Sequence, residues 1–237
     1  MLLCALPREA YALSGVHLAI GASRPLGDHA QLRVSGPGPL AARDAVAALA
    51  ARIDPSATLL GIGVAGALAP ELAAGDVILG TALVDDQPSS PAAPASLPSR
   101  VGDRLRREGL RVRAGTIVST AKVVDSAEAK DDLRQRFPNA CAVDMESAAY
   151  AREAQRHGIA FATLRVIIDE AHMGIPPAAT ESLRPDGETH LPTLLYSLLR
   201  RPSQLPSLLR LGQAWRRAQA SLQVCGRGLS QPDTQAP

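Results

Sequence analysis

Aromatic residues and cysteines are scarce in this chain of 237 residues. Phe, Trp and Tyr make up only 3% of it, so Ala, Leu and Val must supply most of the packing in any core. The three cysteines, Cys4, Cys141 and Cys225, include no CxxC pair and show no spacing typical of a metal site. The sequence therefore favours neither a disulfide scaffold nor a metal centre, and it suits a reducing, cytoplasmic environment.

Long apolar runs and a strong excess of one charge are also missing. No uninterrupted apolar stretch reaches about 18 residues, so no membrane-spanning helix is expected. The N-terminal run is broken by Pro7, Arg8 and Glu9, which makes it a poor signal peptide. The net charge is +2, and no dense Lys/Arg patch is interleaved with aromatics, so a nucleic-acid partner is not expected.

The chain does contain a series of short apolar runs with helical patterns between them. Five runs are predicted to be strands buried on both faces, at residues 2–6, 58–64, 77–84, 114–120 and 159–168. Helices are predicted at 41–53 and 127–137, the second with Ser126 as its N-cap. Strands that alternate with helices predict a single three-layer α/β/α domain.

Residues 142–171 combine an apolar pattern with acidic ends. The pattern predicts an amphipathic helix that Gly158 stops, followed by a buried strand. Asp144 and Glu146 stand at the front of this unit, and Asp169 with Glu170 closes it. In α/β folds ligands gather at the carboxyl ends of the strands, so these carboxylates are candidates for a site.

The composition changes along the rest of the chain. Residues 85–100 are rich in Pro and Ser and are expected to form a long loop, and residues 229–237 to form a disordered tail. From about residue 190 the chain is rich in Leu and Arg, and LPTLL and LPSLL place Pro where helices begin. Two interpretations stay open for this part: helices that pack on the core, or a basic amphipathic hairpin that lies on a membrane or frames an apolar substrate channel.

The segment GIGVAG at 61–66 matches the GxGxxG pattern of dinucleotide-binding folds. Such folds need a long helix directly after the glycines, but Pro70 and the Gly75-Asp76 turn leave no room for one. Two alternatives remain, a packing turn between strands and a glycine loop whose backbone N–H groups approach a small ligand. We favour the glycine loop.

Three carboxylates lie near the ends of predicted elements: Glu9, Glu146 and Asp169. The sequence has no GxSxG motif and no HExxH spacing, so acid–base chemistry by carboxylates is the best catalytic interpretation. Cleavage of a glycosidic bond suits such a set, because one acid protonates the leaving group while another carboxylate orients water. Each also has a structural alternative, since an acid in the first turn of a helix is favoured by the helix dipole alone.

The order and spacing of four segments carry a resemblance to a known family. GIGVAGALAPELAAGDVIL, GTIVSTAKVV, FPNACAVDMESAAYA and FATLRVIIDEA resemble the nucleoside phosphorylase / methylthioadenosine–S-adenosylhomocysteine nucleosidase superfamily. The segment LRPDGETHLPTLLYSLLRRPSQLPSLLRLGQAWRRAQASL resembles its hopanoid-associated phosphorylase branch, which is associated with release of adenine from adenosylhopane. The resemblance implies a mixed central sheet, a catalytic domain at 1–189 and a helical extension at 190–228.

The resemblance also implies roles for individual residues. Asp169 would protonate N7 of the purine, and Glu9 would activate water. Glu146 would bind the ribose hydroxyls, with Met145 under the sugar. A turn formed by Val64, Ala65 and Gly66 would approach the ribose. Val123 and Val124 would line the base pocket.

The chain departs from the family pattern at several of these positions. Ile168 replaces the Ser that usually precedes the catalytic Asp, Val64 stands where relatives often have Ser, and Ala67 replaces a second Gly. Arg8 and Arg43 are the nearest candidates to hold phosphate, so the acceptor, water or phosphate, stays open. No metal or organic cofactor is expected.

The function expected from the sequence is cleavage of the N-glycosidic bond of an adenosyl compound, with adenosylhopane as the substrate. One alternative is a methylthioadenosine/S-adenosylhomocysteine nucleosidase, and another is a nucleoside-binding protein without catalysis. A homo-oligomer in the cytoplasm is expected, with peripheral contact of the C-terminal helices with the inner membrane.

Overall fold

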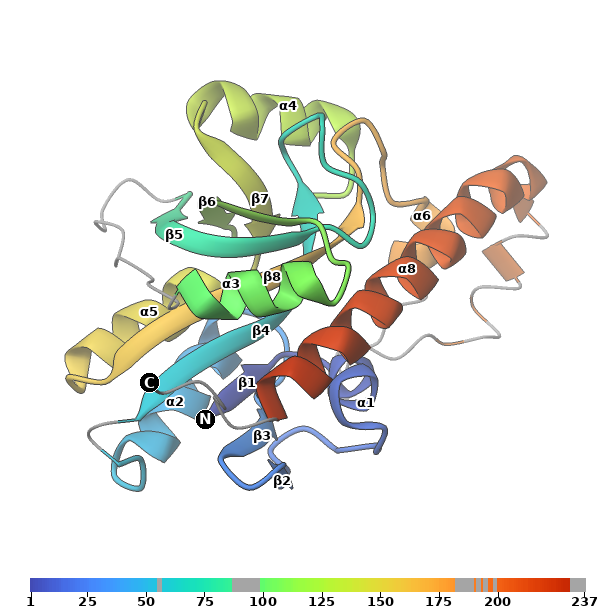
Figure 1. Cartoon of the computed structure of the whole chain (residues 1–237). Helices are drawn as coiled ribbons and strands as arrows, with labels where there is room; N and C mark the ends of the chain where they lie inside the picture. The colour runs from blue at the N-terminus through green and yellow to red at the C-terminus, as the bar shows by residue number, and fades with distance from the viewer. Residues whose placement is uncertain are drawn as a thin grey trace.

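The computed structural model describes residues 1–54, 57–86, 99–181, 190, 193, 196, 197 and 200–230. Its centre is an eight-stranded sheet of mixed direction (Figure 1). The strands are β1 (Leu2–Cys4), β2 (Ser23–Leu26), β3 (Ala30–Val34), β4 (Thr58–Ala67), β5 (Val77–Asp85), β6 (Val112–Ser119), β7 (Ala140–Asp144) and β8 (Ala160–Asp169).

The strand order is β2-β3-β1-β4-β7-β6-β5-β8, and β4 also pairs with β8. The β4–β8 pairing is parallel, whereas β4–β7 and β5–β8 are antiparallel. These pairings close five of the strands, β4, β7, β6, β5 and β8, into a ring. The ring brings the carboxyl ends of β4 and β8 side by side.

Helices cover the sheet on both faces. They are α1 (Pro7–Ser14), α2 (Pro39–Ala50), α3 (Ser99–Arg107), α4 (Ala127–Arg136), α5 (Ser147–Arg156), α6 (Pro177–Glu181), the 3-10 helix η1 (Pro202–Gln204) and α8 (Leu205–Ser230). Helices α1 and α8 pack on one face, in a core that contains Leu13 and Leu222. Helices α2 and α5 pack on the other, in a core that contains Val46 and Tyr150. The expected α/β/α architecture with a mixed sheet is thereby confirmed.

All five expected strands are present, and both expected helices form at 39–50 and 127–136. Ser126 caps α4 as predicted, because its Oγ accepts a hydrogen bond of 3.1 Å from the Ala129 N–H. Gly158 follows the end of α5 with φ of 68°, a left-handed conformation that favours glycine after a helix. The polar strands β2 and β3 and the helices α1 and α3 were not predicted.

Two sequence predictions about element type are wrong. Residues 140–144 are strand β7 rather than the start of the helix, so α5 begins only at Ser147. Its apolar residues fit either element because a short buried run does not reveal its period. The GIGVAG segment is neither a turn nor a loop, because β4 runs through all of it.

The C-terminal part contains one long helix whose second half belongs to the main core. Ala218, Leu222 and Cys225 of α8 are fully buried against the sheet and α1. Its first half exposes Leu205 and Leu209, and it begins with a Pro at the second position as LPSLL predicts. The helix continues to Ser230, so the expected tail at 229–237 begins too early. Residues 231–237, most of the 85–100 loop and the 189/190 domain boundary lie outside the described residues.

Among the described residues, no helix has the length and apolarity that crossing a membrane requires.

Gly226 of α8 lies close against the backbone of α1, and its replacement tests this packing. A Cβ at position 226 would lie 2.1 Å from the backbone oxygen of Leu13, so one helix would have to shift. We expect Gly226→Ala to lower the free energy of unfolding by about 1–3 kcal/mol. Urea unfolding followed by circular dichroism measures this change.

Gly212 of the same helix provides the matched control, because a Cβ there meets nothing within 4 Å. Gly212→Ala should raise stability by up to about 1 kcal/mol through helix propensity. Equal effects of the two substitutions would show that α8 does not pack on α1 as described.

Candidate active site

Arg165, in the middle of β8, is a fully buried charge. Its Nε donates to Asp144 Oδ2 at 2.6 Å, and its Nε and Nη2 donate to Ser147 Oγ at 3.1 and 3.0 Å. Burial alone would lower the pKa of Arg165, but the carboxylates of Asp144, Glu146 and Glu9 together raise it above its usual value. The guanidinium is thus a permanent cation among three acids.

Asp144 is held at the end of β7 by groups from neighbouring elements. Ser119 Oγ at the end of β6 donates to Asp144 Oδ1 at 2.5 Å, and Ser147 Oγ donates to the other carboxylate oxygen. Every bond to Asp144 therefore comes from a donor suited to an ionised carboxylate. Asp144 is the structural partner of Arg165 rather than a group that faces a ligand.

Glu9, on α1, carries a buried carboxylate that three backbone N–H groups hold. Its Oε2 accepts from Ala5 and Leu6, each at 2.9 Å, and its Oε1 accepts from Val64 at 2.8 Å. Burial raises the pKa of Glu9, although these hydrogen bonds and Arg165 oppose the rise. With 2% of its surface exposed, Glu9 is not a solvated acid at the surface.

The glycines of GIGVAG make room for these side chains. A Cβ on Gly63 would lie 2.6 Å from Glu9 Oε1 and 2.7 Å from Arg165 Nη1, and a Cβ on Gly66 would lie 3.1 Å from Asp169 Oδ2. The glycines therefore let a strand, rather than a loop, pass directly beneath the acidic groups.

Glu146 precedes α5 at its N-cap position, yet its side chain makes no capping bond to that helix. Its Oε1 instead accepts from the Gly38 N–H at 2.8 Å, at the start of α2. Burial raises the pKa of Glu146 to about 7, with Asp144 and Glu9 adding to the rise and Arg165 opposing it. Simple helix capping therefore does not explain this residue.

Asp169 ends β8 and forms a buried ion pair with Lys130 of α4. The Lys130 ammonium also donates to the backbone oxygens of Glu170 at 2.7 Å and Met173 at 3.0 Å. Burial raises the pKa of Asp169, and the nearby Lys130 opposes the rise. Lys130 is thus the side chain that holds the Asp169 carboxylate in this structure.

The register of the sheet aims Asp169 at this site. Asp169, and not Ile168, comes opposite Gly66 of β4, so β8 carries one extra residue there. Such a bulge re-aims the side chain that follows it. Gly63 and Gly66 are about 10 Å apart along an extended strand, so Glu9 and Asp169 lie at two separate points along the end of β4.

The other residues predicted to contact the nucleoside differ in their position and in how far they are buried. Val64 and Ala65 lie in β4 and not in a turn, and Met145 is half-buried between Asp144 and Glu146. Val124 packs beside α4, whereas Val123 is 46% exposed. Their predicted contacts with a nucleoside stay predictions.

Arg8 and Arg43, the nearest candidates to hold phosphate, contact groups outside the acid cluster. Arg8 lies over the Trp215 ring at 5.0 Å, and Arg43 pairs with Asp44 on the surface. Sequence reasoning missed Arg165 and Lys130, which are the cations that contact the acids. A single Arg inside the apolar run AFATLRVII was the available signal for Arg165, since an unpaired charge is not tolerated in a buried strand. Lys130 lies in a polar helix and had no such signal.

Replacing Glu146 with Gln tests the cost of burying its charge. Because its pKa is about 7 in the folded protein and 4.5 unfolded, only the folded state holds this proton between those values. Stability should therefore fall as pH rises from 4.5 through about 7, and Glu146→Gln should make that fall smaller. Urea unfolding of both proteins across this range measures the difference. Parallel stability curves for the two proteins would contradict the raised pKa.

Comparison with known proteins identifies the family of the chain. Residues 26–186 match the family model described as the phosphorylase superfamily. A 5'-methylthioadenosine/S-adenosylhomocysteine nucleosidase of Staphylococcus aureus (strain JH9) is 28% identical over 130 residues. That match covers 48% of this chain and 57% of the relative, so the chain aligns with little more than half the length of such curated relatives.

Solved structures share the fold across nearly the whole chain. The 5'-methylthioadenosine/S-adenosylhomocysteine nucleosidase of Neisseria meningitidis, in complex with methylthio-immucillin-A, superposes with a TM-score of 0.68 at 20% identity and covers 97% of each chain. The futalosine hydrolase of Helicobacter pylori gives a TM-score of 0.66 at 19% identity, over 96% of this chain and 94% of that one. At this level of identity the likeness establishes the fold alone. With the family model matching well over half of its residues, the chain belongs to the phosphorylase superfamily.

Proposed function

We propose that this protein is an enzyme that cleaves the N-glycosidic bond of an adenosyl nucleoside and releases adenine. The observation that carries the proposal is the pair of buried acids, Glu9 and Asp169, at two points along the end of β4. Burial raises the pKa of both, which is the direction that an acid needs in order to hold a proton at higher pH. Superfamily membership and the nucleosidase relatives support the same reaction.

In the proposed reaction the bond between C1′ of the ribose and N9 of the purine breaks, and its electrons go to the purine. Asp169 gives a proton to N7, which makes adenine a neutral leaving group. The ammonium of Lys130 is bonded directly to the Asp169 carboxyl group. Lys130 therefore either returns a proton to Asp169 after the transfer or holds its carboxylate in place. Glu146 binds the ribose hydroxyls through the oxygen that Gly38 leaves free.

On the opposite side of the sugar, water attacks C1′ and passes its proton to Glu9. The Nη1 of Arg165 is buried, lies against Gly63 as Glu9 Oε1 does, and has no hydrogen-bond partner among the described residues. A buried donor of this kind is costly unless a ligand uses it, so we assign it to the attacking oxygen. Phosphate could replace water here without a change in the bond that is cleaved.

Two kinds of substrate fit the proposal. The nucleosidase relatives favour methylthioadenosine or S-adenosylhomocysteine. Adenosylhopane is the second candidate, because the first half of α8 exposes Leu205 and Leu209 next to Arg210. Exposed leucines beside arginines suit a lipid-linked substrate and peripheral contact with an anionic membrane. The cytoplasmic location and the homo-oligomer stay predictions.

Adenine release from methylthioadenosine and from adenosylhopane, each with and without phosphate, tests the function. We expect release from one of them, and Asp169→Asn should slow it about 10²- to 10⁴-fold by removing the acid. Asp131→Asn on the exposed face of α4 is the control and should leave the rate unchanged. Binding of either nucleoside without release would favour the non-catalytic alternative.

The role of Lys130 in protonating the leaving group can be tested with a substrate whose leaving group needs no proton. If Lys130 serves protonation, Lys130→Met should slow adenine release about 10²-fold or more, while cleavage of a 4-nitrophenyl riboside is nearly unaffected. The ratio of the two rates is the readout, because misfolding would lower both together. An equal loss on both substrates would assign Lys130 to structure alone.

A further inference from the structure

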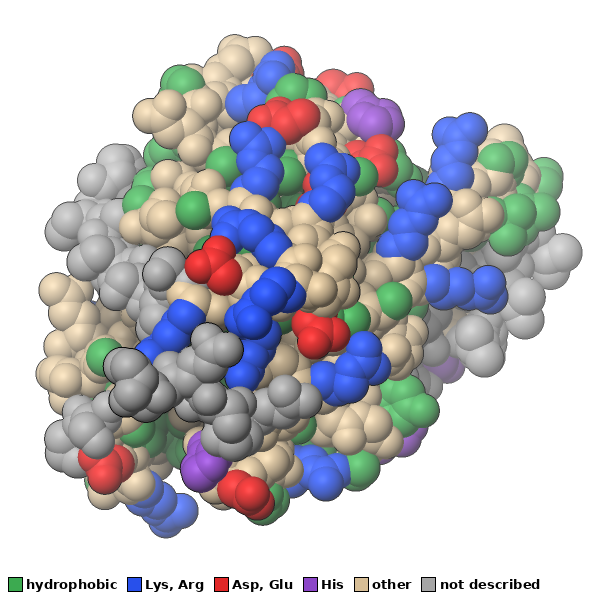
Figure 2. All heavy atoms as spheres, viewed as in Figure 1, with side chains coloured by type: hydrophobic (Ala, Val, Ile, Leu, Met, Phe, Trp, Pro, Cys, Tyr) green, Lys and Arg blue, Asp and Glu red, His purple; other side chains and the backbone are tan. Residues whose placement is uncertain are grey.

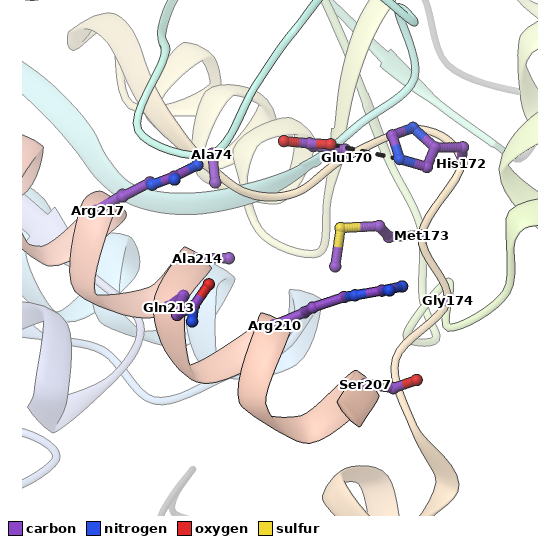
Figure 3. Close-up of a pocket in the computed structure, with 10 residues that line it drawn as sticks. All are labelled: Ala74, Glu170, His172, Met173, Gly174, Ser207, Arg210, Gln213, Ala214 and Arg217. Carbon is purple, nitrogen blue, oxygen red and sulfur yellow. Dashed lines mark ion pairs between the residues drawn. The ribbon is translucent and has the colours of Figure 1, made fainter. Parts of the chain in front are cut away.

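A pocket of about 430 Å³ lies between α8 and the segment that follows β8 (Figure 3). Glu9, Glu146, Arg165 and Asp169 do not line it, although Glu170 of its lining directly follows Asp169 in the chain. Ten residues line it: Ala74, Glu170, His172, Met173, Gly174, Ser207, Arg210, Gln213, Ala214 and Arg217.

One face of α8 supplies two cations to this pocket. Arg210 and Arg217 are seven residues apart, which is close to two helical turns, so both project from the same face. Gln213 and Ala214 lie between them on that face. In Figure 3 the Arg210 side chain extends toward Met173 and Gly174, and the Arg217 side chain extends toward Ala74. Neither arginine forms an ion pair with any described residue. Figure 2 shows further Lys and Arg side chains on this side of the molecule.

The wall opposite α8 is the segment that follows β8, and Lys130 of the candidate active site holds its backbone in place. Glu170 and His172 pair with each other at 3.4 Å, so the one carboxylate in the pocket is directed at the imidazole. The backbone oxygens of Glu170 and Met173 accept hydrogen bonds from Lys130, the partner of Asp169. The pocket thus has a fixed wall and an excess of positive charge.

We propose that this pocket binds a small phosphate monoester. Two guanidinium groups from one helix face match a dianion, since a single carboxylate would be satisfied by one bidentate arginine. The volume is far larger than a phosphate group needs, and Met173, Ala74 and Ala214 offer apolar contacts to the organic part. The ligand chemistry follows from the pocket alone and does not rest on the proposed function.

Isothermal titration calorimetry with glycerol 3-phosphate, at constant ionic strength, tests the proposal on the full-length protein. We expect binding that Arg210→Gln and Arg217→Gln each weaken about tenfold, because each removes a charge-assisted contact. Arg216→Gln is the matched control, since Arg216 is exposed on the same helix but does not line the pocket. Glu170→Gln should tighten binding, because it removes the only negative charge from the lining.

Several results would overturn the proposal. No binding at millimolar glycerol 3-phosphate would do so, as would binding that neither arginine substitution affects. A separate binding experiment uses phosphatidylglycerol vesicles in place of glycerol 3-phosphate. Binding to vesicles that Arg210→Gln and Arg216→Gln weaken equally, without binding of glycerol 3-phosphate, would show a surface patch for membranes instead of a pocket for a small molecule. Loss of adenine release in other experiments leaves this binding test unaffected.

Discussion

The buried guanidinium of Arg165 is the charge around which the acids of this protein are arranged. A single cation in the middle of a sheet is tolerated only if anions surround it, and removal of one partner of such a buried pair costs about 3–5 kcal/mol. Asp144 meets this need through direct hydrogen bonds at the end of β7. Glu9 and Glu146 lie within the same field but bond to backbone N–H groups, which leaves them able to face a ligand.

Small side chains make this arrangement geometrically feasible. With few aromatics, the helices approach the sheet and one another closely, as Gly226 does against the backbone of Leu13. Small residues also make room in β4, where Gly63 and Gly66 leave space for Glu9, Arg165 and Asp169. A Cβ at either glycine would compete with the acids for the same space. The glycine pattern that resembles a dinucleotide motif therefore serves a different purpose here.

Each of the two buried cations, Arg165 and Lys130, lies near different acids of the site. Arg165 balances Glu9 and Glu146 on the sugar side of the proposed reaction, and Lys130 balances Asp169 on the purine side. Lys130 also fixes the backbone of the segment after β8, which forms one wall of the arginine-lined pocket. The pocket wall and the proposed acid therefore share one ammonium as a hydrogen-bond partner.

The sequence by itself determined the long buried strands, two of the helices and three carboxylates that the structure buries, Glu9, Glu146 and Asp169, because apolar periodicity and the ends of elements are local properties. It also placed Ser126 and Gly158 correctly, since capping depends on a few neighbouring residues. Strand β7 was mistaken for helix because its five residues are too few to show a period. Only the tertiary structure decided that β4 closes a ring with β8, that a bulge turns Asp169 toward Gly66, and that Lys130 from a polar helix becomes its buried partner. Those features depend on contacts between residues far apart in the chain, where local propensity carries no information.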